Sequence, residues 1–206
     1  MQHPLSILAD EAYKVFSELG FEIALGPELE TEWYNFDALN VGKDHPARDM
    51  QDTFWVLPPP RPSGTPPQAG GENPPRLSKE GVGGGDLVLR THCTATTARA
   101  LEQAGKDGRL PAAFISIGKA FRNEATDITH EMQFFQIDGI MVGSIEDGVS
   151  LANLKGVLEH FYKKMLGEDV EVEFRPSFFP FTEPSIEVFA KFKGKWLEMM
   201  GAGMIH

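Results

Sequence analysis

The sequence predicts an α+β fold in which a mainly antiparallel sheet is flanked by helices. Two segments, residues 3–20 and 150–166, place apolar residues at helical spacing. Later parts of the chain contain short apolar or alternating runs that are typical of strands: residues 87–89, 113–117, 134–142, 170–174, 186–192 and 196–200. Gly194 suits the turn of a hairpin between the last two runs. Helices and strands in this order favour an α+β domain.

The predicted helices have recognisable starts or ends. Gly20 is a natural stop for the first helix, and residues 21–25 then indicate a strand that ends at Gly26-Pro27. Thr94 is the predicted N-cap of a short helix over residues 94–104, which Gly105 ends. The last helix carries a core stripe of Leu154, Val157, Leu158, Phe161 and Met165.

Composition predicts one globular domain over residues 1–206. The chain has 206 residues, of which 41% are hydrophobic and 24% charged, so it can bury a sizeable core. Residues 58–86 are dominated by proline and glycine, which predicts a surface loop without regular structure inside that domain. No apolar run is long enough for a membrane span and no signal peptide is recognisable, so we expect no membrane partner.

Charge and cysteine content exclude further classes. A formal net charge of −11 argues against a self-sufficient nucleic-acid binder, which normally carries a basic face. Cys93 is the only cysteine, which rules out an intrachain disulfide and a cysteine-rich zinc site. A reduced, cytoplasmic environment fits this composition.

The segment from Lys119 to Gly139 has the clearest signs of binding chemistry. Apolar runs on both sides of a polar stretch predict a strand, a loop and a second strand. Side chains alternate along a strand, so the second strand divides into one face with Phe134, Gln136 and Asp138 and another that largely holds Phe135, Ile137 and Ile140.

Arg122 and Glu124 share one face at the end of the first of these strands. An open surface with an aromatic ring, an amide, carboxylates and a guanidinium could stack a flat ring, hold phosphates and bind an amine. The alternative interpretation is an edge hairpin with a solvated polar face.

Five blocks in order carry a resemblance to a known family. FRNEATDITHE at residues 121–131 resembles the second class-defining motif of class II aminoacyl-tRNA synthetases, the strand–loop–strand that holds ATP. The other blocks are GPELETEWYNFDALNVGKDHPARDMQDTFWV at 26–56, LRTHCTATTARAL at 89–101, FRPSFFPFTEPS at 174–185 and GKWLEMMGAGMIH at 194–206. Together they are similar to the catalytic region of bacterial-type phenylalanyl-tRNA synthetase alpha subunits, over nearly all of the chain except about residues 58–86.

The resemblance implies a class II synthetase-like fold and an enzyme, a phenylalanine–tRNA ligase that uses ATP and Mg²⁺. It implies that Arg122 grips the α-phosphate and the attacking carboxylate, and that Glu124 contacts the adenine end; these two are the expected catalytic residues. His130 matches a residue that reaches the distal phosphates, and Phe134 matches the aromatic that stacks on adenine. A surface ion pair, a loop histidine and a core phenylalanine are the alternatives.

The amino-acid end of the substrate is assigned in the same way. Gln136 and Asp138 match positions that bind the amino group of phenylalanine, while His92 and the hydroxyl of Thr94 match further substrate contacts. The sequence departs from the family here, because Cys93-Thr94 stands for Thr-Ser, Thr97 for glutamine and Asp138 for glutamate. A thiolate nucleophile at Cys93 is a rival interpretation, although a small packing residue fits better.

The resemblance also implies a pocket for the phenyl ring. Phe179 and Phe181 match an edge-on aromatic wall, and Phe179, Phe181 and Glu183 alternate along a predicted strand and so share a face. Glu183 is the expected metal-associated carboxylate. The small residues Gly201, Ala202 and Gly203 are expected to close the pocket and Trp55 to border it, with core packing and a tight turn as the alternative.

Partners follow from the resemblance as well. It implies L-phenylalanine, tRNA(Phe) bound mainly through parts absent here, and a beta subunit in a heterotetramer of two alpha and two beta chains. The helix and strand over residues 3–27 match the first class II motif and could support a homodimer.

The third class-defining motif has no counterpart before His206, so we expect weak ligand binding and poor aminoacylation by this chain alone. A catalytically inactive synthetase-like fragment or paralogue that acts as a binding module is the alternative function. A generic nucleotide-binding protein is less consistent with the sequence, which has no P-loop or Rossmann fingerprint.

Overall fold

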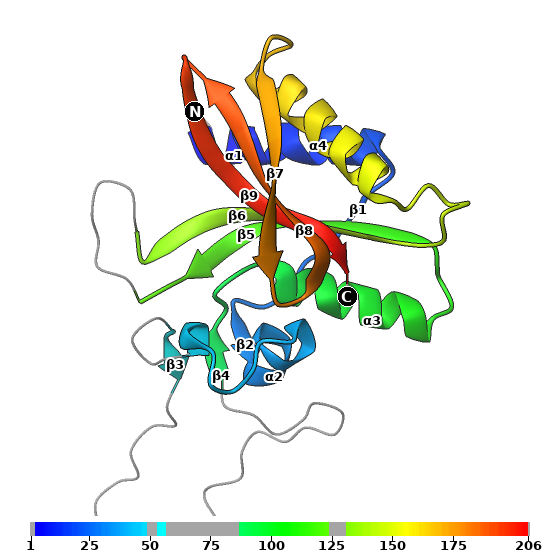
Figure 1. The fold of residues 1–206 in the computed structure, drawn as a ribbon. Helices are drawn as coiled ribbons and strands as arrows, with labels where there is room; N and C mark the ends of the chain where they lie inside the picture. The colour runs from blue at the N-terminus through cyan, green and yellow to red at the C-terminus, as the bar shows by residue number, and fades with distance from the viewer. Residues whose placement is uncertain (1–2, 49–52, 57–86, 124–130, 206) are drawn as a thin grey trace, which may run out of the picture. The chain divides into compact units, whose positions relative to one another are not determined.

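The computed structural model describes residues 3–48, 53–56, 87–123 and 131–205, and these form an α+β fold (Figure 1). The backbone divides into two compact units. Unit 1 comprises Met1–Gly26, Thr96–Ile117 and Ile137–His206, and unit 2 comprises Pro27–Ala95 and Gly118–Gln136. The proline- and glycine-rich loop predicted for residues 58–86 lies outside the described residues. The assignment of residues 1–206 to one catalytic domain stays a prediction.

Unit 1 contains three long helices and two sheets. Its helices are α1 (Pro4–Glu18), most of α3 (Thr94–Lys106) and α4 (Leu151–Leu166). Its strands are β1 (Glu22–Ile23), β7 (Glu171–Phe179), β8 (Thr182–Phe192), β9 (Lys195–Ile205) and parts of β5 (Ala112–Phe121) and β6 (Gln133–Val142). β7, β8 and β9 form an antiparallel sheet in that order, whereas β1 pairs in parallel with β5 (Figure 1). The predicted α+β class is confirmed, with β1 and β5 as a parallel exception.

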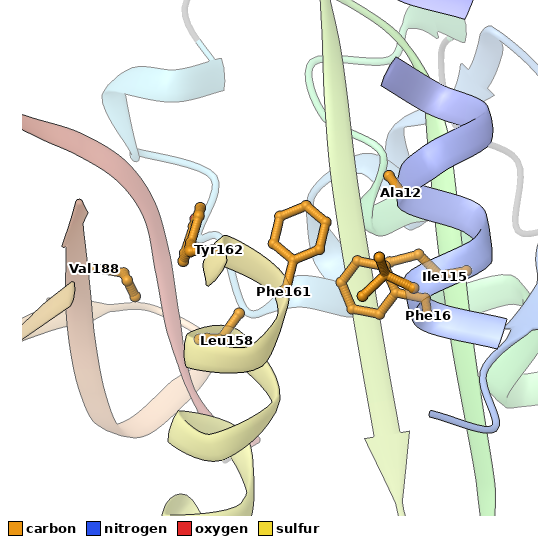
Figure 2. Close-up of a cluster of buried hydrophobic side chains, with 8 residues drawn as sticks. Ala12, Phe16, Ile115, Leu158, Phe161, Tyr162 and Val188 are labelled. Carbon is orange, nitrogen blue, oxygen red and sulfur yellow. The ribbon is translucent and has the colours of Figure 1, made fainter. Parts of the chain in front are cut away.

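The core of unit 1 is formed by residues of the helices α1 and α4 and of the strands β5 and β8. Figure 2 shows Phe16 of α1 and Phe161 of α4 facing each other, and their ring centroids are 4.8 Å apart. Ile115 of β5 and Val188 of β8 are fully buried in the same cluster. The predicted stripe of α4 is confirmed, because Leu154, Val157, Leu158, Phe161 and Met165 all belong to this core or pack against it.

The helix ends agree with the sequence except in α3. Ser150 caps α4 by accepting a 3.1 Å hydrogen bond from Asn153 N, and Gly20 follows α1 with a φ of 85°. Thr94, in contrast, is the first residue of α3 and not its cap, and the helix continues through Gly105 to Lys106. A single glycine inside a helix costs only about 1 kcal/mol relative to alanine, so packing overrides it.

The predicted strand through Phe179, Phe181 and Glu183 is wrong. Phe179 ends β7 and pairs with Thr182 of β8, so Pro180 and Phe181 form a two-residue hairpin turn. Proline has no backbone N–H to donate within a ladder, which disfavours a continuous strand at this point. The alternation that placed all three side chains on one face therefore does not apply.

The strand β6 confirms the alternation predicted for residues 134–142, with one correction. Ile137 packs against the core cluster around Phe16, whereas Ile140 packs against Ala24, Ala104 and Phe114. Ile140 therefore lies with the even-numbered residues and not with Ile137, as a strict period of two requires.

Unit 2 is built around a small antiparallel sheet. Its strands are β2 (Leu29–Thr31), β3 (Trp55–Val56) and β4 (Leu87–Leu89), in the order β2-β4-β3. The short helix α2 (Glu32–Asn35) and two 3-10 turns, Asp37–Leu39 and Pro46–Arg48, follow β2. None of the helices in the described part of the chain is long and apolar enough to cross a membrane.

Arg48 organises the irregular segment between α2 and β3. Its buried guanidinium donates to the carbonyl of Val41 and forms ion pairs with Glu32 at 2.8 Å and Asp37 at 2.5 Å. It also lies 5.0 Å from the centroid of the Phe36 ring. These bonds fix a segment that has little regular hydrogen bonding of its own.

Candidate functional site

Arg122 and Phe134 meet in unit 2, where Arg122 follows the end of β5 and Phe134 lies near the start of β6. Arg122 N donates to Met132 O at 3.0 Å just beyond the end of β5, which keeps the two chain segments paired. The guanidinium carbon lies 5.0 Å from the Phe134 ring centroid, and the Arg122 side chain is exposed. A cation is thus held over an aromatic face, a combination suited to a flat, phosphorylated ligand. Glu124 and His130 lie outside the described residues.

Gln136 connects the block at residues 89–101 to the β6 strand. Its Oε1 accepts a 3.0 Å hydrogen bond from Cys93 N, between the expected substrate contacts His92 and Thr94. The Cys93 Sγ is buried and lies 3.5 Å from Gly118 O and 3.6 Å from Gln136 O. Two backbone acceptors around a buried thiol fit a small packing residue better than a nucleophile.

His92 is a half-buried, neutral imidazole. Burial is the main reason that the pKa of His92 falls to about 4, and the charges of Arg122 and Arg90 lower it further. Two backbone groups raise the pKa of His92: the carbonyl of Asn35, which accepts a 3.0 Å hydrogen bond from Nε2, and the backbone of His92 itself. Nδ1 is buried and has no hydrogen-bond partner among the described residues.

Trp55 lies in β3 and stacks on Phe36, with ring centroids 6.2 Å apart and an interplanar angle of 29°. Its indole Nε1 is also buried without a hydrogen-bond partner in the described part of the chain. A buried donor in this state is uncommon and often marks a place for a bound polar group or water. The expectation that Trp55 borders a substrate cavity stays a prediction.

Asp138 is held by Thr97 within unit 1. Thr97 Oγ1 donates to Asp138 Oδ2 at 2.5 Å, which connects α3 to β6. Thr97 is fully buried and Asp138 is half-buried. The Thr97 hydroxyl therefore orients the Asp138 carboxylate, which was expected to bind an amino group.

Phe179 lies against Gly201 across the β7-β8-β9 sheet. A side chain at Gly201 would overlap the Phe179 ring, coming within 2.6 Å of Cε2. Gly203 faces Thr182 and the carbonyl of Pro184, so its small size is required by the chain itself. Ala202 packs against the core cluster. The structure thus joins Phe179 to Gly201, while the substrate contacts expected of all three small residues stay predictions.

The remaining pocket residues lie at the β7-β8 hairpin. Phe181 is half-buried in the turn, and Glu183 is exposed at the start of β8. The Ser185 hydroxyl accepts from Phe179 N at 3.2 Å and donates to Thr182 O at 2.7 Å, which fixes the turn. This hairpin therefore holds Phe179 in a defined place at the end of β7.

No group of three or more histidine, cysteine, aspartate or glutamate side chains forms a metal site among the described residues. Glu183 is a single exposed carboxylate. Mg²⁺ at nucleotide sites commonly takes one or two protein carboxylates and completes its shell with phosphate oxygens and water. Glu183 therefore has the chemistry of a single Mg²⁺ ligand, and its assignment to a metal stays a prediction.

Sequence reasoning missed Asn35 and Arg48, which organise unit 2. Asn35 is fully buried and bonds to Thr91, while Arg48 holds the segment around Phe36. The only local signal for Asn35 is its position as a polar residue between Tyr34 and Phe36.

Comparison with known proteins gives the family. The model of the family described as tRNA synthetases class II core domain (F) matches residues 1–206. The chain belongs to this family. Phenylalanine–tRNA ligase alpha subunits are among its relatives: that of Macrococcus caseolyticus is 41% identical over 216 residues, and that of Bacillus pumilus is 39% identical over 217 residues.

The matches differ in how much of each protein they cover. They include 99% and 100% of this chain but 52% and 54% of the two ligase subunits, so the chain spans about half the length of these relatives. Two structures of pyrrolysyl-tRNA synthetase from Desulfitobacterium hafniense superpose with TM-scores of 0.65 and 0.64. Each superposition covers 97% of this chain and 58% of the synthetase chain, with sequence identities of 15% and 17%. The likeness supports the class II fold of the family.

Proposed function

We propose that this chain is the catalytic part of a phenylalanine–tRNA ligase, which activates L-phenylalanine with ATP and transfers it to tRNA(Phe). The observation that carries the proposal is the 3.0 Å hydrogen bond from Cys93 N to Gln136 Oε1. It joins the block at residues 89–101 to Gln136, which is distant in sequence, and both match amino-acid-binding positions of the ligase. The names of the relatives support the same substrate.

Arg122 is the proposed centre of the activation step. A phenylalanine carboxylate oxygen forms a bond to the α-phosphorus of ATP, the bond from that phosphorus to the bridging oxygen breaks, and pyrophosphate leaves with the electron pair. Negative charge accumulates around the phosphorus, and a guanidinium that grips both reactants neutralises it and aligns them. Arg122 is exposed and therefore accessible to a phosphate.

Other residues take supporting roles in this proposal. Phe134 stacks the adenine, Glu124 contacts its edge, and His130 reaches the distal phosphates. Glu183 would hold Mg²⁺, which supplies charge neutralisation on the phosphate oxygens when it is bound. The chain's own residues then bind and orient ATP.

The amino acid is recognised at its two ends. The amino group is bound by Gln136 and Asp138, because an acidic group suits an ammonium ion. His92 and Thr94 are further contacts, and they stand on either side of Cys93, which donates to Gln136. The phenyl ring meets Phe179 and Phe181, since aromatic rings prefer edge-to-face contacts. The other proposed residues of the phenyl pocket are Trp55 at its border and the small residues Gly201, Ala202 and Gly203, which close it.

The whole protein has further proposed partners. A net charge of −11 leaves this chain poorly suited to bind tRNA by itself, so we assign most of that surface to other sequence and to a beta subunit. The proposed assembly is a heterotetramer of two alpha and two beta chains in the cytoplasm.

Phenylalanine-dependent ATP–pyrophosphate exchange tests the function. The exchange rate is measured with this chain and with a longer protein that includes any residues encoded after His206. We expect exchange that Arg122→Ala lowers by about 10²–10³-fold, the usual effect of removing a group that stabilises transition-state charge.

Arg175→Ala is the matched control, because Arg175 is also exposed and lies 3.9 Å from the Phe189 ring centroid. This variant should retain exchange. Absence of exchange in both forms of the protein would overturn the proposal and favour a synthetase-like binding module.

A further inference from the structure

Asn35 makes three hydrogen bonds to two consecutive residues of unit 2. Its side-chain Nδ2 donates to Thr91 Oγ1 at 3.0 Å, and its Oδ1 accepts from Thr91 N at 3.0 Å. Its backbone carbonyl lies 3.0 Å from His92 Nε2. Asn35 is fully buried and Thr91 is buried, so these bonds are shielded from competing water.

The contact with His92 fixes where the ring proton lies. A carbonyl oxygen can only accept, so Nε2 must carry the proton and donate it to Asn35 O. In a neutral imidazole the other nitrogen is then an acceptor with a lone pair. Burial, the main cause, lowers the pKa of His92 to about 4, which keeps the ring neutral at physiological pH.

The charged groups near His92 also favour the neutral imidazole. Arg122 and Arg90 both lower the pKa of His92, because a second positive charge beside a guanidinium is unfavourable. Nδ1 is left as a buried acceptor without a partner among the described residues. Such an atom usually pairs with a donor from water or a ligand.

We propose that Asn35 is a positioning residue that holds His92 as the Nε2–H tautomer, so that Nδ1 is the acceptor for a hydrogen-bond donor of the bound amino acid. The amide pair with Thr91 fixes the backbone from which the imidazole projects, and the carbonyl fixes the proton. This inference rests on the proposed function for the identity of the ligand. The donor that an amino acid offers is its ammonium group.

The tautomer is measured first, in the ligand-free protein. Imidazole nitrogen shifts in long-range proton–nitrogen NMR spectra distinguish the two neutral tautomers, and the His92→Gln spectrum identifies the His92 signals among those of six histidines. We expect the Nε2–H tautomer in the natural chain and a mixture in Asn35→Ala. A pure Nδ1–H form in the natural chain, or an unchanged tautomer in Asn35→Ala, would overturn the positioning role.

Asn40→Gly is the control for this spectrum. Asn40 is an exposed asparagine five residues along the same segment with a φ of 55°, a backbone conformation that glycine adopts readily. The variant should keep the His92 signals of the natural chain.

A second pair of variants covers the case in which Asn35→Ala does not fold. Thr91→Val removes the hydroxyl that accepts from Asn35 Nδ2, whereas Thr91→Ser keeps it. We expect Thr91→Val to broaden the tautomer distribution and Thr91→Ser to restore it. Equal spectra for the two variants would contradict the role of the amide pair.

Ligand binding is measured second, by calorimetry with L-phenylalanine and with 3-phenylpropanoate, which lacks the ammonium group. Loss of a hydrogen bond to a charged group corresponds to about 10–100-fold in affinity. We expect Asn35→Ala and Thr91→Val to lower the affinity for phenylalanine by at least about 10-fold. The affinity for 3-phenylpropanoate should not change.

The outcomes separate the two proposals. Equal weakening of both ligands would overturn the link between Nδ1 and the ammonium group. The expected tautomer shift without any phenylalanine binding by the natural chain would overturn the proposed function and this link, while the positioning of His92 would stand.

Discussion

Thr97 Oγ1 donates a 2.5 Å hydrogen bond to Asp138 Oδ2 inside unit 1. A hydroxyl–carboxylate bond of this length is of the short, charge-assisted kind. The family resemblance leads one to expect glutamine at position 97 and glutamate at position 138, and both residues here are shorter. The two departures therefore lie on the same contact.

Replacement of Thr97 by valine tests this contact. The shape of the side chain is kept while the hydroxyl is lost, so Asp138 loses a partner in a half-buried place. We expect the free energy of unfolding in urea to fall by about 1.5–3 kcal/mol, the usual range for a hydrogen bond to a charged group. Thr97→Ser is the control, since it keeps the hydroxyl and loses only a methyl group. A Thr97→Val protein at least as stable as Thr97→Ser would show that the bond contributes little.

Gly201→Ala is expected to displace the Phe179 ring. A Cβ atom at this position would lie 2.6 Å from Phe179 Cε2, so the ring must move or the strands must separate. Overpacking of this kind typically costs about 1–3 kcal/mol. The measurement is the urea midpoint together with phenylalanine binding, which the proposed function predicts to weaken.

Gly156→Ala is the matched control. Gly156 lies inside α4 with nothing within 4 Å of an added Cβ, and it should gain about 0.5–1 kcal/mol from helix propensity. Phe179→Ala in the Gly201→Ala background should lose less stability than Phe179→Ala does in the natural chain. Additive losses would mean that the ring and the glycine do not interact.

Replacement of Arg48 by lysine is expected to disorganise the segment after α2. Lysine keeps the charge but cannot bond to Val41 O, Glu32 and Asp37 at once. The charge stays in place and both carboxylates are partly exposed, so the loss is that of hydrogen bonds between charged groups. We expect the free energy of unfolding in urea to fall by about 1.5–3 kcal/mol.

Trp55 fluorescence is the measurement for this variant, because Trp55 stacks on Phe36, the ring that also contacts the Arg48 guanidinium. Trp33 and Trp196 are replaced by phenylalanine so that one tryptophan reports. Arg175→Lys is the control: the arginine is exposed and pairs with exposed Glu173, so the midpoint should change little. Equal effects of the two lysines would contradict a special role for Arg48.

The parts of the fold that the sequence predicted are those with a local signal. The stripe of α4 and the alternation of β6 repeat with the period of their secondary structure, and burial follows that period. The turn at Pro180-Phe181 was missed because aromatic residues on both sides indicated a continuous strand. Gly201 and Gly203 belong to β9 although glycine disfavours strands, since pairing with β8 holds them there.

The residues of the candidate site also differ in whether the local sequence indicates them. Arg122 and Phe134 could be found because both lie in the short segment from Lys119 to Gly139, and the structure brings them together. The role of Asn35 could not, because its partners Thr91 and His92 lie more than fifty residues away and leave no local pattern. Contacts of this kind are set by tertiary packing.

His92 should make the stability of the protein depend on pH. Burial lowers its folded-state pKa from 6.5 to about 4, so between these values the unfolded chain binds more protons than the folded one. Stability therefore rises as the pH increases from 4 to 6.5 and gains nothing from His92 above that, with a total change on the order of 3 kcal/mol. The free energy of unfolding in urea is measured from pH 4.5 to 7.5 for the natural chain, His92→Gln and His92→Asn. Both neutral replacements should flatten the rise across this window, because neither can take up the proton; if the slopes of all three proteins coincided, the depressed pKa of His92 would be refuted and the Nε2–H assignment would lose its electrostatic support.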